Sequence, residues 1–197
     1  MASFEYSFDE QILAPSDNEI VRVVFTMPLN EGRLSEYCRA HGIVSYLPLR
    51  KAILLKRKKY KDKSYQYQNI VLRPMFPGYL FVKLSPDQRS ELFRSQSVVR
   101  ILGDTLQNQG KLLEEIRLVK QIEEIAKTDE VEFNAQLKEG DKFFIESGGP
   151  WQGSYGWLKK KRKRFLWTIE IECLNTLVQA TIDPSMYKMT PVSDFPR

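Results

Sequence analysis

The chain has 197 residues, 42% of them hydrophobic, so it can form one large domain or two small ones around an apolar core. It contains no run of about eighteen apolar residues and does not begin with a basic segment followed by an apolar one, so we expect neither a membrane-spanning helix nor a secretory signal. The two cysteines, Cys38 and Cys173, are too distant in sequence to suggest a disulfide framework or a zinc site, which favours the reducing cytoplasm.

The net charge of +5 is unevenly distributed. Residues 56–63 hold six cations and one anion, and residues 159–164 are six cations in a row. The remaining 18 cations and 24 anions leave the rest of the chain mildly acidic. Dense clusters of like charge repel one another unless an anionic partner is near, so the two clusters indicate contact with nucleic acid. The alternative is a pair of solvated hairpin tips.

The N-terminal half begins with a polar stretch over residues 1–18, for which we expect a flexible arm. The β-branched run 20–26 predicts a strand. A helix is expected over 31–41, with Asn30 as its N-cap and Gly42 as its end. We expect a second strand over residues 43–49 and then a long hairpin arm over residues 53–67 that carries the first cation cluster.

A ten-residue segment, 73–82, carries the clearest local signal in the chain. Its two prolines and Gly78 are typical of the entry to a strand, here predicted over 79–84. The Leu and Val side chains of this strand point to one face, which we expect to be core. Tyr79 and Phe81 point to the other face, where they either pack beneath a helix or form a binding surface.

Two helices and a strand follow. Ser85 is expected to cap a short helix over 86–95, and residues 98–102 predict a strand. Apolar residues recur at intervals of three or four over 111–127, which predicts an amphipathic helix. Its apolar stripe spans too few heptads for a coiled coil, so we expect it to pack on the sheet. The acidic stretch 128–137 has no periodicity and is interpreted as a linker.

The sequence beyond the linker is typical of a small all-β unit. Residues 148–156 are rich in glycine and form a tight connection, and both 165–172 and 178–182 alternate as strands do. Short strands joined by Gly/Pro turns favour a small barrel. The predicted organisation is α+β, with an arm at 1–18, a first domain at 19–127, a linker at 128–137 and a barrel at 138–197.

No pattern in the sequence indicates catalysis. His41 is the single histidine, and no nucleophile or carboxylate stands at a recognisable catalytic spacing. The glycines between residues 148 and 156 lie between strands and open no helix, so they fail the test for a nucleotide-binding loop. Acidic pairs such as Glu114 and Glu115 are typical of solvated helix faces. We therefore expect no catalytic residue, no metal site and no cofactor.

The segment from Pro74 to Val82, followed by a short helix and the strand ending at Leu102, resembles the N-terminal (NGN) domain of NusG-type transcription factors. The later glycine-rich run resembles their KOW motif, carried by Gly140, Gly149, Pro150, Gly153 and Gly156. The resemblance covers roughly residues 19–190 in the family's order, and it is closer to the specialised antitermination paralogues than to the housekeeping factor. It implies a four-stranded antiparallel sheet with flanking helices, followed by an SH3-like barrel.

The resemblance also implies partners. In the family, the NGN domain binds the β′ clamp helices of RNA polymerase through an apolar pocket and so disfavours pausing. Carried over by motif, the pocket consists of Phe25, Tyr79, Phe81 and Leu102. The helix after Ser85 would face the opposite β pincer, by way of Gln88, Arg89 and Ser90. The KOW barrel would recruit a ribosomal protein or a termination factor.

The basic clusters would then lie near upstream or non-template DNA or the nascent RNA. The candidate nucleic-acid-binding residues are Lys56, Arg57, Lys58, Lys59, Lys61, Lys63, Lys159, Lys160, Lys161, Arg162, Lys163 and Arg164. Tyr60, Tyr65 and Tyr67 could stack on exposed bases, whereas Trp157 and Trp167 are expected in the barrel core. The chain departs from the family pattern at Val21-Arg22, where an aromatic pair is usual. Met27-Pro28 replaces the basic residue that the specialised branch often carries after this strand, which weakens the expectation that a specific DNA element is read by that route. The sequence indicates a cytoplasmic monomer without membrane contact, and the alternative function is a KOW-containing RNA- or ribosome-associated protein.

Overall fold

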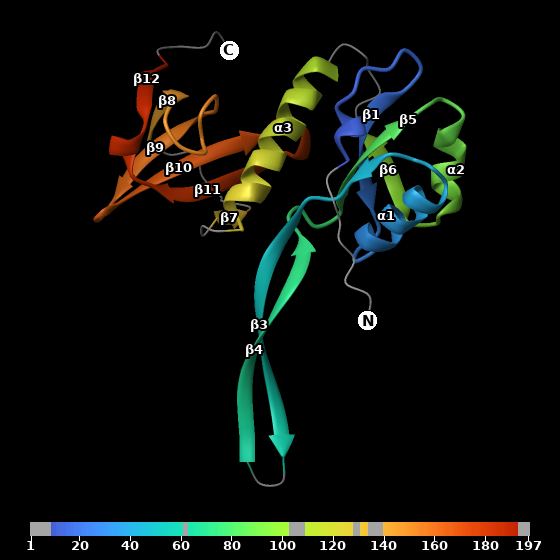
Figure 1. Cartoon of the computed structure of the whole chain (residues 1–197), viewed down its shortest axis with the longest axis horizontal. Coiled ribbons are helices and arrows are strands. Elements are labelled where there is room, and N and C mark those ends of the chain that lie inside the picture. Colours follow the sequence, from blue (N-terminus) through green and yellow to red (C-terminus); the bar gives the residue numbers. More distant parts are fainter. Residues whose placement is uncertain (1–8, 61–62, 103–108, 128–130, 134–139, 193–197) are drawn as a thin grey trace.

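The computed structural model describes residues 9–60, 63–102, 109–127, 131–133 and 140–192. Its first part contains the predicted four-stranded antiparallel sheet, in the order β2-β5-β1-β6 (Figure 1). The strands are β1 (Ile20–Thr26), β2 (Ser45–Tyr46), β5 (Tyr79–Leu84) and β6 (Val98–Leu102). Three of them have the predicted bounds, because β-branched runs and alternation mark strands locally. The strand expected over 43–49 is shortened to β2.

Helices α1 (Glu31–Ala40) and α2 (Gln88–Arg94) cover one face of the sheet. Leu34, Leu80 and Leu92 are fully buried in the core between these helices and the sheet. Asn30 occupies the N-cap position of α1 without a side-chain capping bond. The N-cap position of α2 is Asp87, without a side-chain capping bond, and not Ser85 as predicted. Ser85 and Gln88 bond reciprocally in the turn that leads into the helix.

Helix α3 (Gln109–Ile125) and the short η1 (Glu10–Ile12) pack on the other face. Ile12 has no exposed surface, and Lys83 Nζ donates to the carbonyl oxygens of Gln11 and Ala14. This part of the stretch predicted as a flexible arm is therefore anchored to the sheet. No helix in the described ranges is long and apolar enough to cross a membrane.

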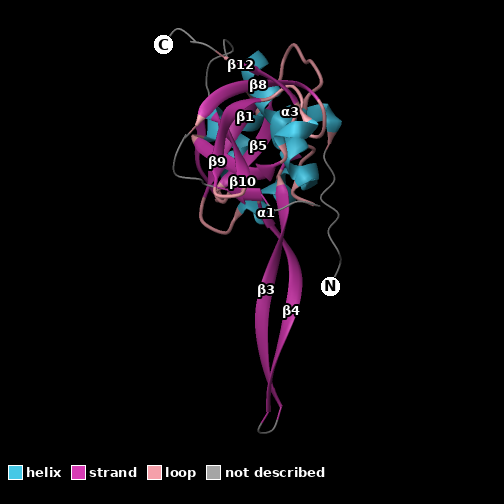
Figure 2. Cartoon of the chain, turned by 90° about the vertical axis from the view of Figure 1, so that its left-hand side faces the viewer, coloured by secondary structure: helices cyan, strands magenta, loops and turns pink. Residues whose placement is uncertain are grey.

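A two-stranded hairpin, β3 (Leu49–Tyr60) and β4 (Lys63–Pro74), projects from the body in both views (Figures 1 and 2). The strands pair along their whole length, from Leu49 opposite Pro74 to Tyr60 opposite Lys63. The hairpin is longer at both ends than the predicted arm. Its base is tied to α3, because the Leu49 amide donates to Glu123 Oε1 over 2.9 Å.

The second part is an antiparallel six-stranded sheet in the order β12-β8-β9-β10-β11-β7, as expected for the all-β unit. Its strands are β7 (Val131–Phe133), β8 (Asp141–Ser147), β9 (Tyr155–Lys161), β10 (Arg164–Ile171), β11 (Thr176–Ile182) and β12 (Lys188–Pro191), with η3 (Glu172–Leu174) and η4 (Pro184–Met186). Residues 131–133 were predicted in the linker but pair with β11, so the barrel borrows a strand from that segment.

The barrel packs against α3, which stands between the two sheets (Figure 1). Glu115 Oε2 accepts from the Cys173 amide over 2.9 Å, and the Gln121 side chain donates to the Pro150 carbonyl. Lys111 pairs with Glu172 at the same junction. One apolar cluster runs from the sheet through α3 into the barrel core.

Candidate functional site

The sheet carries a row of three partly exposed side chains on the face that α3 shares. Register places Phe25 of β1 between Tyr79 of β5 and Arg100 of β6. The Phe25 and Tyr79 ring centroids are 5.3 Å apart, and the Arg100 guanidinium lies 5.6 Å from the Phe25 centroid. We call Phe25, Tyr79 and Arg100 the aromatic row. An arginine beside two aromatics is the composition typical of a binding hot spot.

Gly78 positions this row. It has φ +87°, and a Cβ on it would lie 2.9 Å from the Phe25 ring, so the ring rests on a backbone without a side chain. The Gly78 amide donates to the buried Glu31 carboxylate over 2.6 Å, and its carbonyl accepts from the Thr26 amide. The Pro-Gly turn before β5 therefore determines where the aromatic row lies.

The other two predicted polymerase contacts, Phe81 and Leu102, are outside the aromatic row and less accessible. Phe81 is only 1% exposed and stacks on Tyr46 with ring centroids 5.9 Å apart. The Tyr46 hydroxyl donates to Glu123 of α3 over 3.0 Å, and burial raises the pKa of this tyrosine. Phe81 thus belongs to the core beneath α3, because that helix covers the part of the sheet where Phe81 pairs with Val23. Leu102 is half-buried against the same cluster.

Further apolar side chains that the sequence did not single out are exposed just after the end of β1 and at the start of β6. Met27 is 45% exposed, Val99 50% and Leu29 94%. A register shift beside Phe25 leaves Val99 unpaired, and Leu29 has φ 64° in the turn before α1. The available signal in the sequence was Leu29 itself, a large apolar residue between Pro28 and the helix-capping position Asn30.

The candidate contacts on α2 lie elsewhere. Arg89 lines a cavity of about 750 Å³ with Asp17, Arg22 and Asp87.

The single histidine lies on the same side of the sheet, between α1 and α2. The exposed His41 ring stacks on the Tyr37 ring with 4.0 Å between the ring centroids, and the Tyr37 hydroxyl donates to Glu91 over 2.6 Å. That hydrogen bond raises the pKa of Tyr37 and lowers that of Glu91. These contacts join α1 to α2, which is a structural role for the single histidine.

The first basic cluster forms the outer half of the hairpin, residues 56–67, which we call the hairpin tip. Lys56 and Arg57 are exposed, and Tyr65 and Tyr67 are 54% and 48% exposed. Lys56 pairs with Tyr67, so a cation and a ring share one rung. Beyond them, the side chains of Lys58, Lys59, Tyr60, Lys61 and Lys63 lie outside the described residues.

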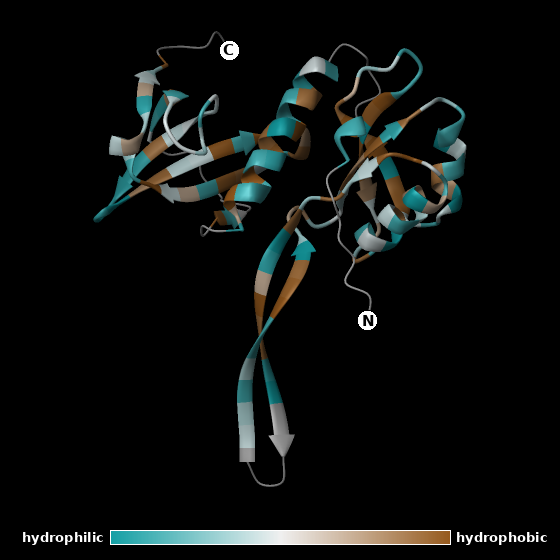
Figure 3. Ribbon diagram, viewed as in Figure 1, coloured by the Kyte–Doolittle hydropathy of each residue, from teal (hydrophilic) through white to brown (hydrophobic). Residues whose placement is uncertain are grey.

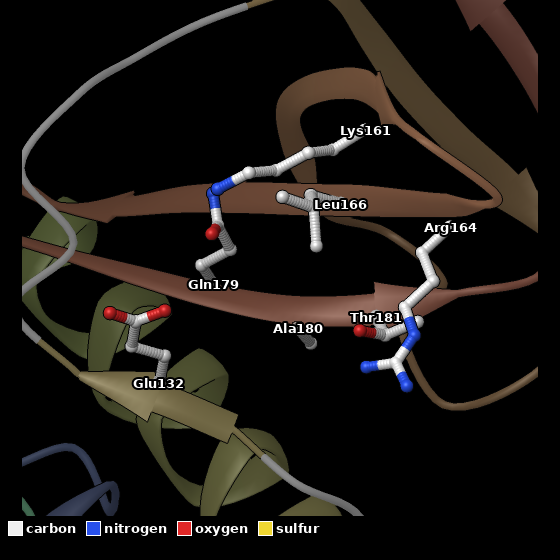
Figure 4. A pocket seen from close by; sticks show the side chains of 7 residues that line it. All are labelled: Glu132, Lys161, Arg164, Leu166, Gln179, Ala180 and Thr181. Carbon is white, nitrogen blue, oxygen red and sulfur yellow. The ribbon is translucent and has the colours of Figure 1, made fainter.

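The second basic cluster is the β9–β10 hairpin of the barrel. Lys161 and Arg164 face each other and line a pocket of about 280 Å³ together with Gln179. Figure 4 shows Lys161 extended toward Gln179 and Arg164 turned toward Thr181, so the two cations do not converge. The others occupy the strand and turn: Lys159, half-buried, and Lys160, Arg162 and Lys163, exposed.

The two tryptophans predicted for the barrel core, Trp157 and Trp167, differ in burial. Trp167 has no exposed surface and lies in the barrel core. Trp157 is half-buried on the outer face, with Lys142 Nζ 5.4 Å from its ring centroid. The expectation that both lie in the core was wrong for Trp157, because it pairs with Thr168 and so alternates out of register with Trp167.

The KOW-motif residues lie in β9 and in the turns before and between β8 and β9. A Cβ on Gly140 would lie 2.1 Å from the Leu158 carbonyl oxygen, and one on Gly156 would lie 2.5 Å from that of Thr168. These two glycines therefore allow close strand approach. Gly149 and Gly153 have positive φ in the β8–β9 connection, where Pro150 accepts the bond from α3.

Comparison with known proteins gives the family. The family model described as transcription termination factor nusG matches residues 22–122, just over half of the chain. A structure describing domain interaction in Thermotoga maritima NusG matches at 16% identity and TM-score 0.46, covering 86% of this chain and 96% of that one. A chain of the MjSpt4:Spt5 complex matches at 16% identity and TM-score 0.28, covering 89% of this chain and all of that one. Among curated proteins none matches. The sequence match over the first domain shows that this chain belongs to the NusG family of transcription factors.

Proposed function

We propose that this chain is a transcription elongation and antitermination factor that binds RNA polymerase through the aromatic row and acts without a catalytic site. The observation that carries the proposal is the row itself: the half-exposed rings of Phe25 and Tyr79 beside the exposed Arg100, with the Phe25 ring over Gly78. Exposed Met27, Leu29 and Val99 extend the apolar surface at the same strand ends. In the NusG resemblance this face meets the β′ clamp helices, and the α2 side meets the β pincer.

Phe81 has a supporting role in this proposal. Its ring lies one rung from the aromatic row and is covered by α3. It holds the sheet and helix together under the exposed residues. Leu102 is half-buried on the other side of β1, opposite Val23, and forms the margin of the proposed contact.

The hairpin tip supports a second contact, with upstream or non-template DNA or nascent RNA. Its cations favour phosphate without regard to sequence, and the half-exposed Tyr65 and Tyr67 offer surfaces on which bases stack. The barrel would recruit a ribosomal protein or a termination factor in the cytoplasm. As in the specialised paralogues, the outcome would be suppressed pausing or termination.

The proposal is tested by binding to purified core polymerase. Tyr79→Ala and Phe25→Ala are each expected to weaken binding by about tenfold or more, because anchor side chains in a desolvated contact contribute about 2 kcal/mol. The control is Tyr155→Ala, which removes a ring 48% exposed on β9 of the barrel, where the proposal places no polymerase contact. It should bind as the parent does.

Unchanged binding by both row variants would reject the polymerase contact. The alternative, an RNA- or ribosome-associated protein, draws support from the exposed cations of the β9–β10 hairpin. It predicts RNA binding that survives loss of the aromatic row and no measurable affinity for polymerase. A transcription assay across a terminator, with and without the row variants, reports the antitermination step directly.

A further inference from the structure

The half of the hairpin nearest the body exposes a diagonal line of aliphatic side chains. Leu72 is 57% exposed, Ile53 62%, Ile70 66% and Leu55 69%. Register places Ile53 opposite Ile70, with Leu72 one rung toward the body and Leu55 one rung toward the tip, all on one face. We call these four residues the aliphatic stripe. Figure 3 shows the hydrophobic colouring in this half of both strands and the hydrophilic colouring beyond it.

Such a stripe is unfavourable in water. An isolated two-stranded ribbon is marginally stable, and monomeric proteins seldom expose contiguous aliphatic surface unless it binds something. Long apolar edge strands also invite aggregation, which charged side chains nearby only partly prevent. The stripe therefore indicates a surface that is covered when the protein works.

The charge of the hairpin distinguishes the molecules that could cover the stripe: a second copy of the chain, a lipid surface, nucleic acid or another protein. Residues 49–74 contain nine cations and a single acid, Asp62. A second copy would bring the same excess and be repelled. A lipid surface would require the apolar residues at the tip with the cations behind them, and the order here is the reverse. Nucleic acid is attracted to the cations of the tip, whereas the aliphatic stripe offers it neither hydrogen-bond donors nor rings.

The ends of the stripe carry charge that suits an acidic protein. Lys51 shares the rung of Leu72, and Arg57 lies one rung beyond Leu55 on the same face. The three rungs from Lys51 to Leu55 span about 13 Å, because each strand residue advances about 3.3 Å. That length corresponds to between two and three turns of an α-helix.

We propose that the aliphatic stripe binds an amphipathic helix of a protein partner, with an apolar face flanked by acidic side chains. Lys51 and Arg57 pair with the acidic residues while the stripe buries the apolar face. This surface is separate from the aromatic row. The two halves of the hairpin would then bind different partners: nucleic acid at the tip and a protein helix nearer the body.

The test uses the full chain and three labelled 18-residue helical peptides. One has leucines at helical spacing flanked by glutamates, the second has every glutamate replaced by lysine, and the third has every leucine replaced by serine. Only the first is expected to bind. Changing Ile53→Thr together with Ile70→Thr should weaken that binding by about tenfold or more, since Thr keeps the strand preference but removes aliphatic surface.

Adjacent leucines provide the matched control. Leu55→Thr is expected to weaken peptide binding, and Leu54→Thr, the same change one residue away on the opposite face, should leave it unchanged. Circular dichroism and limited proteolysis check that both variants keep the hairpin. Equal binding of the three peptides, or equal loss in both leucine variants, overturns the proposal.

Two other measurements distinguish the other occupants. A dimer in sedimentation velocity that dissociates in the Ile53/Ile70 variant would show a second copy on the stripe. A loss of DNA affinity in that variant as large as the loss caused by Lys56→Gln would show nucleic acid there. Either result overturns the acidic-helix proposal.

Discussion

Gly78 positions the Phe25 ring, which is the centre of the aromatic row. An L side chain at φ +87° is strained, and its Cβ would meet the Phe25 ring at 2.9 Å. Because that ring is half-exposed, it can tilt away, so the steric conflict should displace the proposed polymerase-binding surface more than it unfolds the protein. The sequence motif and the site geometry are therefore linked through one glycine.

Gly78→Ala is expected to destabilise the fold by about 1–2 kcal/mol, the usual penalty for a left-handed non-glycine residue, and to weaken polymerase binding by about tenfold. Gly153→Ala is the control, because Gly153 has φ +81° with nothing within 4 Å of an added Cβ. It should show the stability loss alone. Urea unfolding and polymerase titration measure the two effects, and polymerase affinity equal in both variants would contradict the role given to Gly78.

Both thiols are expected to be unreactive in the native protein. Burial raises the pKa of Cys38 to about 12 and also raises that of Cys173. The thiolate is the reactive form, and at pH 8 both groups remain protonated. Ellman's reagent should modify neither cysteine in the native state and both after denaturation. Rapid stoichiometric modification of the folded protein would show that one of them is accessible.

Among the elements, α3 holds the molecule together. It contacts the first sheet through Glu123 and the barrel through Glu115 and Gln121. The amphipathic pattern predicted that the helix packs on the sheet. It did not predict that the same helix also receives the barrel.

Glu115→Ala is expected to lower the free energy of unfolding by about 1–3 kcal/mol, because the Cys173 amide loses its acceptor in a part-buried position. Glu114→Ala changes the neighbouring exposed glutamate and should stay within about 0.5 kcal/mol of the parent. Urea titration of the two variants makes the comparison. Similar midpoints for both would mean that the Glu115 bond does not hold the barrel to α3.

The hairpin tip should give nucleic-acid binding its salt dependence. Changing Lys56, Arg57, Lys58 and Lys59 to Ser is expected to flatten the slope of log affinity against log salt by roughly 0.7–0.9 per lost phosphate contact. The same change at residues 161–164 reports the barrel cluster separately. An unchanged slope in the tip variant would show that the cations of the tip contact solvent and not phosphate.

At the scale of the whole molecule, the two predicted domains share an apolar cluster through α3. That each domain folds by itself remains a prediction. The structure moves the expected start of an independently folding barrel fragment toward residue 131. β7 pairs with β11, and Val131 is 9% exposed, so a barrel that begins at residue 138 lacks a strand that it uses in the full chain.

A fragment spanning 131–197 is therefore expected to be more stable than one spanning 138–197. Both should give dispersed β-type amide spectra, and the longer fragment should have the higher urea midpoint, because three more residues pair with β11. If the two midpoints coincide, β7 is not part of the barrel's stable core. A helical spectrum for either fragment would show that the barrel can refold.

The sequence by itself determined the local elements and the family. Strands 20–26, 79–84 and 98–102 and the long helix follow from periodicity and from Gly/Pro signals, which are properties of neighbouring residues. The tertiary structure alone decided that Phe81 is buried while Tyr79 is half-exposed, that Ile12 is anchored, and that residues 131–133 join the barrel. Alternation assigns a side chain to one face of a strand, but what covers that face depends on segments distant in the sequence, here η1, α3 and β11.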